Sequence, residues 1–375
     1  MHFIDETGGI AGWNVGFQPD GREVVIIAIK KTYTFPELHP KSAAAAMPQV
    51  SGNQVELVLA DEFTGEPGQT APLFETDYSL FKPACDIMLS GTAYSPGGKP
   101  VENTPVRMQV GPLNKTIAVH GNRQWRRTGT GLRPSRAQLF NEMPISYDNA
   151  FGGVDRTNEA KGKTDTFTPN PVGCGYYTNS KTALGQALPN TEEFRNPVRN
   201  PNGKYLPMAF GPIGRSWFPR YKFAGTYDQK WMDERAPILP RNFDNRYYQA
   251  TAPDQQLPYL RGGEQVVLQN LTKEGLVSFC IPQEKMPVLF VPHRGEEVEM
   301  QANIDTIMFE PDKARFSMTW RANYPLYRDC FDVKEVIAGV MPRSWHSKRR
   351  AQRLAKQYYP GLRAMVKARR KGLKK

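Results

Sequence analysis

Residues 209–231 read AFGPIGRSWFPRYKFAGTYDQKW, and residues 243–256 read FDNRYYQATAPDQQ; this part of the chain departs from both helix and strand patterns. Seven prolines lie between positions 207 and 258. Because proline fixes φ and lacks a backbone donor, they exclude a long helix and a central strand from this segment. Disordered segments contain few aromatic residues, so this aromatic-rich segment is predicted to form long, ordered loops.

Aromatic and charged side chains are interleaved through the same segment. Buried Tyr and Trp need both apolar packing and a hydrogen-bond partner, and the neighbouring Asp and Arg residues can supply that partner. Two interpretations remain open, a polar and aromatic loop core that holds strands together, or a binding surface for a partner. The second selects as candidate partner-binding residues Trp217, Arg220, Tyr227, Asp228, Trp231, Phe243, Asp244, Arg246, Asp254, Gln255 and Glu264. We expect all of these except the two arginines to form one spatial cluster.

Outside this segment the sequence favours β structure. Gly and Pro number 32 each among 375 residues, a content typical of turn-rich proteins. A turn at 96–99 predicts a hairpin between residues 87–94 and 106–110. Residues 304–309 and 316–320 alternate apolar and polar side chains, so we expect a hairpin with one buried and one solvent-exposed face. The predicted strands cover residues 13–17, 24–34, 55–60, 87–94, 106–110, 113–119, 265–271, 276–281, 288–291, 304–309 and 316–320.

These strands predict a mainly β protein, with an antiparallel, sandwich-like body built of hairpins and long ordered loops. We expect residues 1–332 to form the body, either as one continuous unit or as two lobes. The two lobes would cover about 1–140 and 200–332, joined by the loop-rich residues 141–199. Residues 333–375 are predicted to form a basic helical C-terminal arm.

The positive charge of the chain is concentrated in its last residues. Thirteen of the 49 Lys and Arg lie between Arg343 and Lys375, with no Asp or Glu, so the preceding residues carry 36 bases against 37 acids. Apolar residues from Ala351 to Val366 recur at steps of three and four, which is one face of a helix interrupted at Pro360. The arm could dock on its own body or bind an acidic protein; nucleic acid and a membrane surface are less favoured. Its candidate charges are Arg349, Arg350, Arg353, Lys356, Lys367, Arg369 and Arg370.

No part of the sequence indicates a membrane span, a secretory signal or a metal site. The longest apolar runs are far shorter than a bilayer is thick, and residues 1–6 lack a basic region followed by an apolar one. We therefore expect a cytoplasmic protein. Cys85, Cys174, Cys280 and Cys330 are widely spaced, which predicts free thiols rather than metal ligands.

A hydrolytic catalytic site cannot be assembled from the sequence. A Ser-His-Asp or Cys-His arrangement needs a positioned histidine, yet all five histidines lie outside the aromatic segment. Paired carboxylates beside aromatic residues would suit a glycosidase, which keeps one alternative open. That alternative is a carbohydrate-active enzyme or carbohydrate-binding protein that uses Asp228, Asp244, Asp254 and Glu264.

Six short motifs follow one another through the aromatic segment: Phe-Gly-Pro-Ile (210–213), Trp-x-Pro-Arg (217–220), Ala-Gly-Thr-Tyr-Asp-x-x-Trp (224–231), Phe-Asp-x-Arg (243–246), Ala-Pro-Asp-Gln-Gln (252–256) and Gly-Gly-Glu (262–264). Their order resembles a bacterial family of domains of unknown function. Its members accompany PAAR-tipped effectors of type VI secretion and act as effector chaperones or adaptors. The resemblance extends from about Lys30 to Arg321. It implies a non-enzymatic protein without a cofactor, which binds a secreted effector or its PAAR domain. Such a protein would load its partner onto the spike protein complex and remain in the cytoplasm of the donor bacterium.

Overall fold

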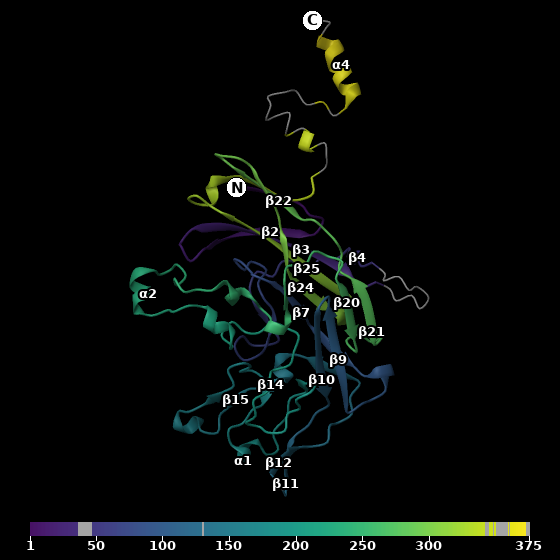
Figure 1. Cartoon of the computed structure of the whole chain (residues 1–375), viewed down its shortest axis with the longest axis vertical. Coiled ribbons are helices and arrows are strands. Elements are labelled where there is room, and N and C mark those ends of the chain that lie inside the picture. The colour runs from purple at the N-terminus through teal and green to yellow at the C-terminus, as the bar shows by residue number, and fades with distance from the viewer. Residues whose placement is uncertain are drawn as a thin grey trace.

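The computed structural model describes residues 1–36, 47–129, 131–341, 345–347, 349, 359 and 361–372. Strands dominate the described chain, which confirms the prediction of a mainly β protein. Three larger sheets lie in the middle of the molecule, and irregular segments cover them (Figure 1). No helix among the described residues is long and apolar enough to cross a membrane.

The largest sheet has seven strands, in the order β19-β7-β24-β25-β3-β2, with β4 beside β3. Neighbouring strands are antiparallel except β7 and β24, which are parallel. β3 and β25 form its centre and pair over eleven residues, from Arg315 opposite Thr34 to Pro325 opposite Val24. The strands are β2 (Ile10–Phe17), β3 (Glu23–Thr34), β4 (Gln49–Val50), β7 (Cys85–Leu89), β19 (Gln256–Leu257), β24 (Asn303–Glu310) and β25 (Arg315–Pro325).

Two further sheets complete the body. The five-stranded sheet has the order β18-β10-β9-β20-β21, and the four-stranded sheet has the order β1-β26-β22-β23. The strands of the first are β9 (Asn103–Val110), β10 (Leu113–His120), β18 (Thr191–Glu193), β20 (Gln265–Gln269) and β21 (Leu276–Cys280). Those of the second are β1 (His2–Glu6), β22 (Pro287–Pro292), β23 (Val298–Gln301) and β26 (Val333–Gly339).

The remaining elements are short. The paired strands are β5 (Glu62–Phe63), β6 (Pro72–Phe74), β8 (Gly91–Tyr94), β11 (Trp125–Thr128), β12 (Gly131–Pro134), β13 (Glu142–Ile145), β14 (Phe151–Gly152), β15 (Val154–Asp155), β16 (Asp165–Thr166) and β17 (Cys174–Gly175). The α-helices are α1 (Ser180–Ala183), α2 (Gln229–Glu234) and α4 (Leu362–Gly372). The 3₁₀ turns are η1 (Pro96–Gly98), η2 (Tyr147–Asn149), η3 (Glu159–Lys161), η4 (Arg220–Phe223), η5 (Asn245–Tyr248), η6 (Pro253–Gln255), η7 (Pro311–Lys313) and η8 (Cys330–Asp332).

One face of the seven-stranded sheet forms an aromatic core with the other two sheets. The ring of Phe316 on β25 stacks on Tyr33 and on Phe279 of β21, with ring centroids 5.2 Å apart in both pairs. Residues of β3, β7, β9, β10, β20, β22 and β26 belong to the same buried cluster. The regions expected as two lobes therefore share the five-stranded sheet and the largest buried cluster, while Trp125, Phe151 and Leu188 belong to a separate, smaller cluster.

The opposite face of this sheet is polar, as the alternation in β24 and β25 predicts, but it is not exposed to solvent. Ser317, Thr319 and Arg321 of β25 are all buried. Residues 55–82 and 209–260, which we call the loop layer, cover this face. One contact between this layer and the sheet is the hydrogen bond that Asp77 accepts from Thr319 Oγ1 at 3.2 Å. The expectation of a solvent-exposed face is thus wrong, because an irregular layer covers polar residues that a two-layer sandwich would leave in water.

Three other predictions are corrected by backbone pairing. Residues 55–60 form no strand, since Val55 bonds to the side chain of Thr32 rather than to a ladder. Residues 87–94 are interrupted at Ser90, whose N–H donates to the Phe309 carbonyl, and the two halves enter different pairs: β7 joins β24, and β8 joins β13 instead of β9. Residues 333–339 are β26 of the body, not the start of a helical arm.

Other predictions are confirmed. The predicted hairpin of 304–309 and 316–320 forms as β24–β25, and the strands predicted at 13–17, 24–34, 106–110, 113–119, 265–271 and 276–281 are present and pair as β2–β3, β9–β10 and β20–β21. Between Ala209 and Leu260 the longest regular element is the six-residue helix α2, as the prolines require. The four cysteines carry free thiols; Cys85 is buried and the other three are half-buried.

Candidate partner-binding surface

Arg220 anchors the first part of the loop layer. Its side chain is buried, and its guanidinium donates to the carbonyl oxygens of Tyr247 and Ile213, each at 2.8 Å, and to the Glu75 carboxylate. Arg215 donates to the same Glu75 oxygen from 2.7 Å. An arginine with several bonded N–H groups holds three chain segments in one geometry. Arg220 therefore supports the surface from beneath and is not itself exposed to a partner.

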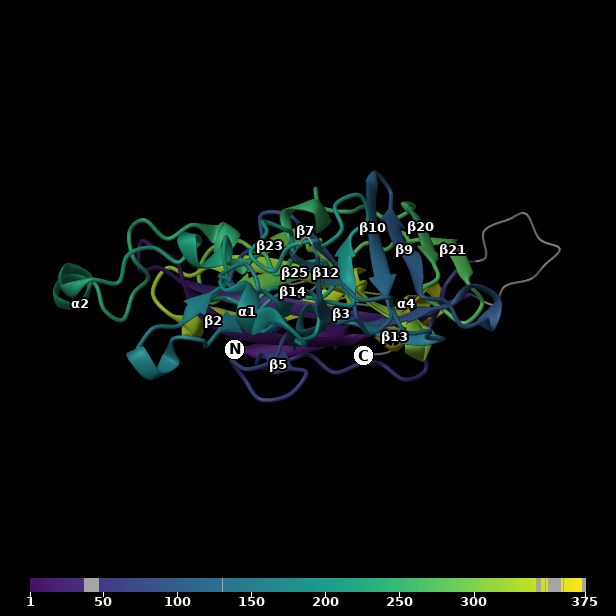
Figure 2. The ribbon, with the colours of Figure 1, turned by 90° about the horizontal axis from the view of Figure 1, so that it is seen from below.

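Helix α2 sits on a protruding loop. Asp228 caps the helix by accepting from the Trp231 N–H at 2.8 Å, and the Trp231 indole N–H donates to the Ile238 carbonyl at 2.8 Å. The Tyr227 ring packs edge-on against Trp231, with centroids 4.7 Å apart. Arg235 ties the loop to the β2–β3 turn by donating to the Pro19 carbonyl. Figures 1 and 2 both show α2 standing away from the sheets at one side of the molecule.

A second group of predicted residues surrounds η5. Asp244 caps this turn by accepting from the Arg246 N–H, and it also binds the Arg246 guanidinium, with Oδ2 and Nη2 2.6 Å apart. The same guanidinium lies over the Phe223 ring, 4.2 Å from its centroid. Because Arg246 and Asp244 are both solvent-accessible, this pair mainly orders the turn rather than stabilising the fold.

The third group lies beside the β9–β10 hairpin. Asp254 and Gln255 both bind the ammonium of the buried Lys115 on β10, at 3.1 and 2.8 Å. Gln255 also donates to the carbonyls of Ile87 and Phe210, so it joins the loop layer to β7. Glu264 accepts from the Arg261 N–H at 3.0 Å. The predicted residues are thus anchored at three places, and the first two are connected because Thr226 and Asn242 exchange hydrogen bonds. That all nine form a single cluster stays a prediction.

Exposed apolar side chains mark the outward surface of the loop layer. Phe218, Tyr221, Tyr227 and Met232 are 38%, 44%, 53% and 61% exposed, whereas Trp217 is buried against Tyr147. We call these four residues the loop-layer surface. Among these four, only Tyr227 is a binding residue predicted from the sequence, because the exposure of Phe218, Tyr221 and Met232 depends on which turn residues fold inward. These residues lie in or next to the short elements η4 and α2, which are too short for a periodic sequence pattern to predict which side chains are exposed.

A cleft of about 420 Å³ opens next to this surface. Arg215, Arg220 and Glu75 form its polar base, and Tyr221 and Tyr247 line its walls. One oxygen of Glu75, Oε2, is buried without a hydrogen-bond partner in the described part of the chain, although Oε1 receives both arginines. The cleft therefore combines aromatic walls with a largely neutralised base.

Asp86 on β7 joins the loop layer to the sheet. It is fully buried and accepts from the Lys82 ammonium at 2.9 Å, from Gln249, and from the N–H groups of Ala250 and Thr251. Burial alone would raise the pKa of the Asp86 carboxyl, but the Lys82 charge and these hydrogen bonds outweigh it and lower the pKa below its usual value. The pKa of Lys82 is raised: burial would lower it, and the Asp86 charge more than offsets that effect.

The candidate charges of the C-terminal arm fall in different places. Arg349 pairs with Glu335 of β26 and with Glu297, at 2.9 and 3.0 Å, and lies over the Trp345 ring. It is therefore docked on the body. Lys367 and Arg369 are exposed on α4, which also contains Arg370, whereas Arg350, Arg353 and Lys356 lie outside the described residues. In Figure 1, α4 lies beyond the four-stranded sheet.

Comparison with family models gives one match. Residues 20–321 match a family described as an uncharacterized protein conserved in bacteria, DUF2169. The match covers most of the chain, so the protein belongs to this family. It includes the loop layer and all of the seven-stranded sheet except β2 and the last four residues of β25. No curated protein and no solved structure matches the chain.

Proposed function

We propose that this protein is a non-catalytic adaptor of type VI secretion. In this proposal it binds a secreted effector, or the PAAR domain of that effector, and loads it onto the spike protein complex in the cytoplasm of the donor bacterium. Two things support the proposal: the resemblance carried by the six motifs, and the design of the loop layer that contains most of them.

The observation that favours a protein partner is the loop-layer surface. Its exposed Phe, Tyr and Met side chains are of the types enriched in protein interfaces, and Lys222 lies 4.5 Å from the centroid of the Phe218 ring. The buried Arg220–Glu75 pair holds the backbone of Phe218 and Tyr221, and hydrogen bonds of Trp231 and Arg235 hold the α2 loop. Little ordering entropy is therefore lost when a partner binds. A preorganised aromatic surface on a rigid base suits an adaptor.

The carbohydrate alternative has weaker support in the geometry. Asp228 and Asp244 cap short helices, Asp254 binds Lys115, and Glu264 binds a backbone N–H. Each of the four carboxylates therefore has a local structural partner. A glycosidase needs two carboxyl groups that face one substrate.

The test is co-expression with a PAAR-containing effector encoded in the same genome. We expect a complex that survives size-exclusion chromatography, and an effector that is more soluble with the adaptor than without it. Replacing Tyr227 and Met232 together by Ala should weaken binding at least tenfold, because exposed aromatic and Met anchors dominate interface energetics. Leu139→Ala is the matched control, since Leu139 is 65% exposed and lies outside the loop layer.

Two results would overturn the proposal. One is the absence of any complex with the PAAR-containing effectors of that genome. The other is cleavage of an oligosaccharide that is lost in single Ala variants of Asp228, Asp244, Asp254 or Glu264 while the thermal midpoint is unchanged.

A further inference from the structure

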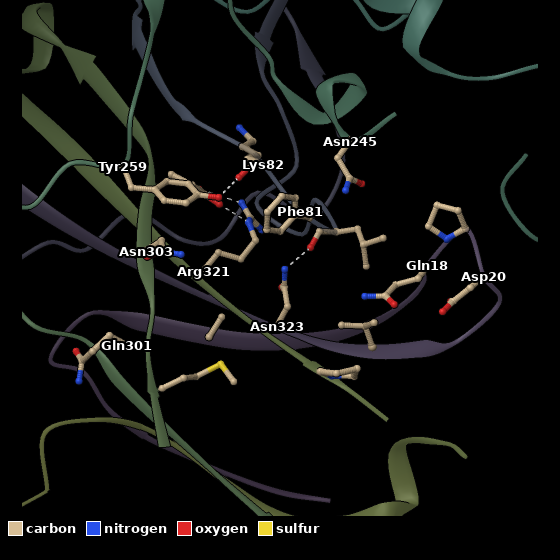
Figure 3. Close-up of a pocket in the computed structure, with 17 residues that line it drawn as sticks. Gln18, Asp20, Phe81, Lys82, Asn245, Tyr259, Gln301, Asn303, Arg321 and Asn323 are labelled. Atoms are coloured by element: carbon tan, nitrogen blue, oxygen red, sulfur yellow. Dashed lines mark hydrogen bonds and ion pairs between the residues drawn. The ribbon is translucent and has the colours of Figure 1, made fainter. Parts of the chain in front are cut away.

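A pocket of about 650 Å³ lies between the seven-stranded sheet and the loop layer (Figure 3). Its walls come from five places: the β2–β3 turn, residues 80–82, η5, Tyr259, and the adjoining parts of β3, β23, β24 and β25. Figure 3 shows Asn323, Asn245 and Gln18 around the open space, with Phe81 between them. The pocket is also connected to the α2 loop, because Arg235 of that loop donates to the carbonyl of Pro19, which lines the pocket.

The pocket occupies a notch in the sheet. β24 begins at Asn303, which pairs with Arg321, whereas β25 continues to Pro325. Before Asn303 the chain leaves this sheet, since the Ala302 N–H donates to the Met286 carbonyl beside β22. On the β24 side, residues 322–325 of β25 therefore have no neighbouring strand among the described residues.

The backbone of Asn323 faces this notch. Leu326 donates its N–H to the Glu23 carbonyl, so Leu326 is directed toward β3. In an antiparallel pair, backbone groups alternate between the two edges of a strand. Tyr324 and Ala322, like Leu326, therefore direct their backbone N–H and C=O toward β3. The N–H and C=O of Asn323 point the other way, to the open edge.

Two carboxamide oxygens in the pocket also lack a donor. The Asn323 side chain donates its amide N–H to the Leu80 carbonyl at 2.6 Å, which fixes the amide orientation and makes its Oδ1 an acceptor. This Oδ1 and the Oδ1 of Asn245 are buried without a hydrogen-bond partner in the described part of the chain. Both oxygens are inaccessible to solvent in this conformation, so a ligand would reach them only after the side chains turn.

Three charged groups of the pocket are already paired, whereas Asp20 has no ion pair in the described part of the chain and accepts from the Arg22 N–H. Arg321 binds Asp305, with Nε and Oδ2 2.5 Å apart, and also donates to the Asp77 carbonyl. Lys82 binds Asp86. The remaining surface includes apolar groups, among them the 40% exposed ring of Phe81. The pocket therefore suits an uncharged ligand with apolar side chains better than a phosphate or a nucleotide.

We propose that the notch receives an extended peptide segment of the partner protein, which continues the position of β24 and pairs with the open edge of β25. The peptide backbone would bond to the N–H and C=O of Asn323, and apolar side chains would contact Phe81. A strand edge presents donor and acceptor at the spacing of another strand, which favours a peptide over an oligosaccharide. The inference rests on the proposed adaptor function, because it identifies a segment of that same partner as the ligand.

The test begins with selection of random twelve-residue peptides, displayed on phage, against the immobilised full chain. The enriched peptide is then titrated calorimetrically, both unmodified and with each backbone nitrogen methylated in turn. We expect methylation at alternate positions to weaken binding at least tenfold, because strand pairing uses every second N–H. Failure to enrich any peptide, or equal tolerance of methylation at all positions, would refute the inference.

Two variants of one residue provide the protein control. Asn323→Ala removes the carboxamide and keeps the backbone N–H, whereas Asn323→Pro removes both and leaves the bonds to β3 intact. Binding should fall at least tenfold further in Asn323→Pro than in Asn323→Ala. If Asn323→Pro fails to fold, the methylated peptides still test the inference on the wild-type chain. Oligosaccharide binding that displaces the peptide and disappears in Asn323→Ala would assign the pocket to a sugar.

The same variants distinguish this inference from the proposed function. If effector binding is lost with the loop-layer variants but unchanged in Asn323→Pro, the adaptor proposal stands and the notch proposal fails. If no PAAR-containing effector binds, yet the selected peptide shows alternating sensitivity to methylation, the notch binds peptide and the adaptor proposal fails.

Discussion

The two faces of the seven-stranded sheet are both buried, yet different forces hold them. On one face, Phe316 and its neighbours pack against two other sheets by apolar contact. On the other, Asp86 of the sheet forms a buried ion pair with Lys82 of the loop layer and accepts from the Ala250 N–H, and Arg321 donates to the Asp77 carbonyl. Buried ion pairs contribute more to specificity than to net stability in some proteins. The apolar face therefore supplies most of the stability, and the polar face holds an irregular layer in one geometry.

Asp86→Ala should have the largest effect of the substitutions considered. It leaves the Lys82 ammonium buried and unpaired, and it removes the acceptor of Gln249, Ala250 and Thr251. We expect a loss of about 5 kcal/mol, at the upper end of values for breaking a buried pair. Urea unfolding of the purified variant measures it. A loss below about 1 kcal/mol would show that the polar face is not held as described.

Phe316→Ala should cost slightly less, about 4 kcal/mol, because it removes a fully buried ring from the shared core and leaves a cavity. Here the loss should come without any change in the loop layer. Hydrogen exchange separates the two faces: amides of 209–260 should exchange faster in Asp86→Ala than in Phe316→Ala at matched global stability. Equal exchange in both would remove the distinction between the faces.

Replacing both members of the pair should cost less than replacing one. Lys82→Met combined with Asp86→Leu leaves no unpaired charge, and such exchanges are often neutral or stabilising elsewhere. Because Gln249, Ala250 and Thr251 still lose their acceptor, we expect a net loss of about 2 kcal/mol. A double-mutant cycle measured by urea unfolding gives the coupling. A loss in the double variant equal to the sum of the single losses would mean that the two charges do not interact.

The pH dependence should differ between the faces. The folded-state pKa of Asp86 lies below its unfolded value of about 4, so its contribution is present above that pH and is lost as the pH falls through the folded pKa. For Lys82 the pKa is raised, so its contribution is lost only in strong base. Between pH 7 and pH 3, wild type and Phe316→Ala should therefore lose stability with a steeper slope than the Lys82→Met/Asp86→Leu double variant, which has neither charge. Parallel slopes in unfolding experiments across this range would contradict the role of Asp86.

The two faces also explain what the sequence could predict. The β24–β25 hairpin and its alternation depend on local pattern and turn residues, and this prediction is confirmed. The hairpin expected between 87–94 and 106–110 does not form, because residues 91–94 pair with β13. Burial of the polar face depends on residues 55–82 and 209–260 crossing it, which no local pattern encodes. The same limit applies to the site: Tyr227 was selected by residue type, but exposure of Phe218 and Met232 follows from the tertiary anchors Arg220 and Arg235.

The smallest expected effect lies where the arm meets the body. Arg349 pairs with Glu297 and Glu335 in a partly exposed position, and pairs of this kind contribute about 1 kcal/mol or less. Arg349→Ala should therefore shift the thermal midpoint only slightly, and the shift should shrink as added salt screens the charges. Lys367→Ala is the matched control, since Lys367 is exposed on α4 and should change nothing measurable. A loss of several kcal/mol in Arg349→Ala would make this contact part of the core, and the C-terminal arm would then stabilise the body rather than act as a separable group of charges.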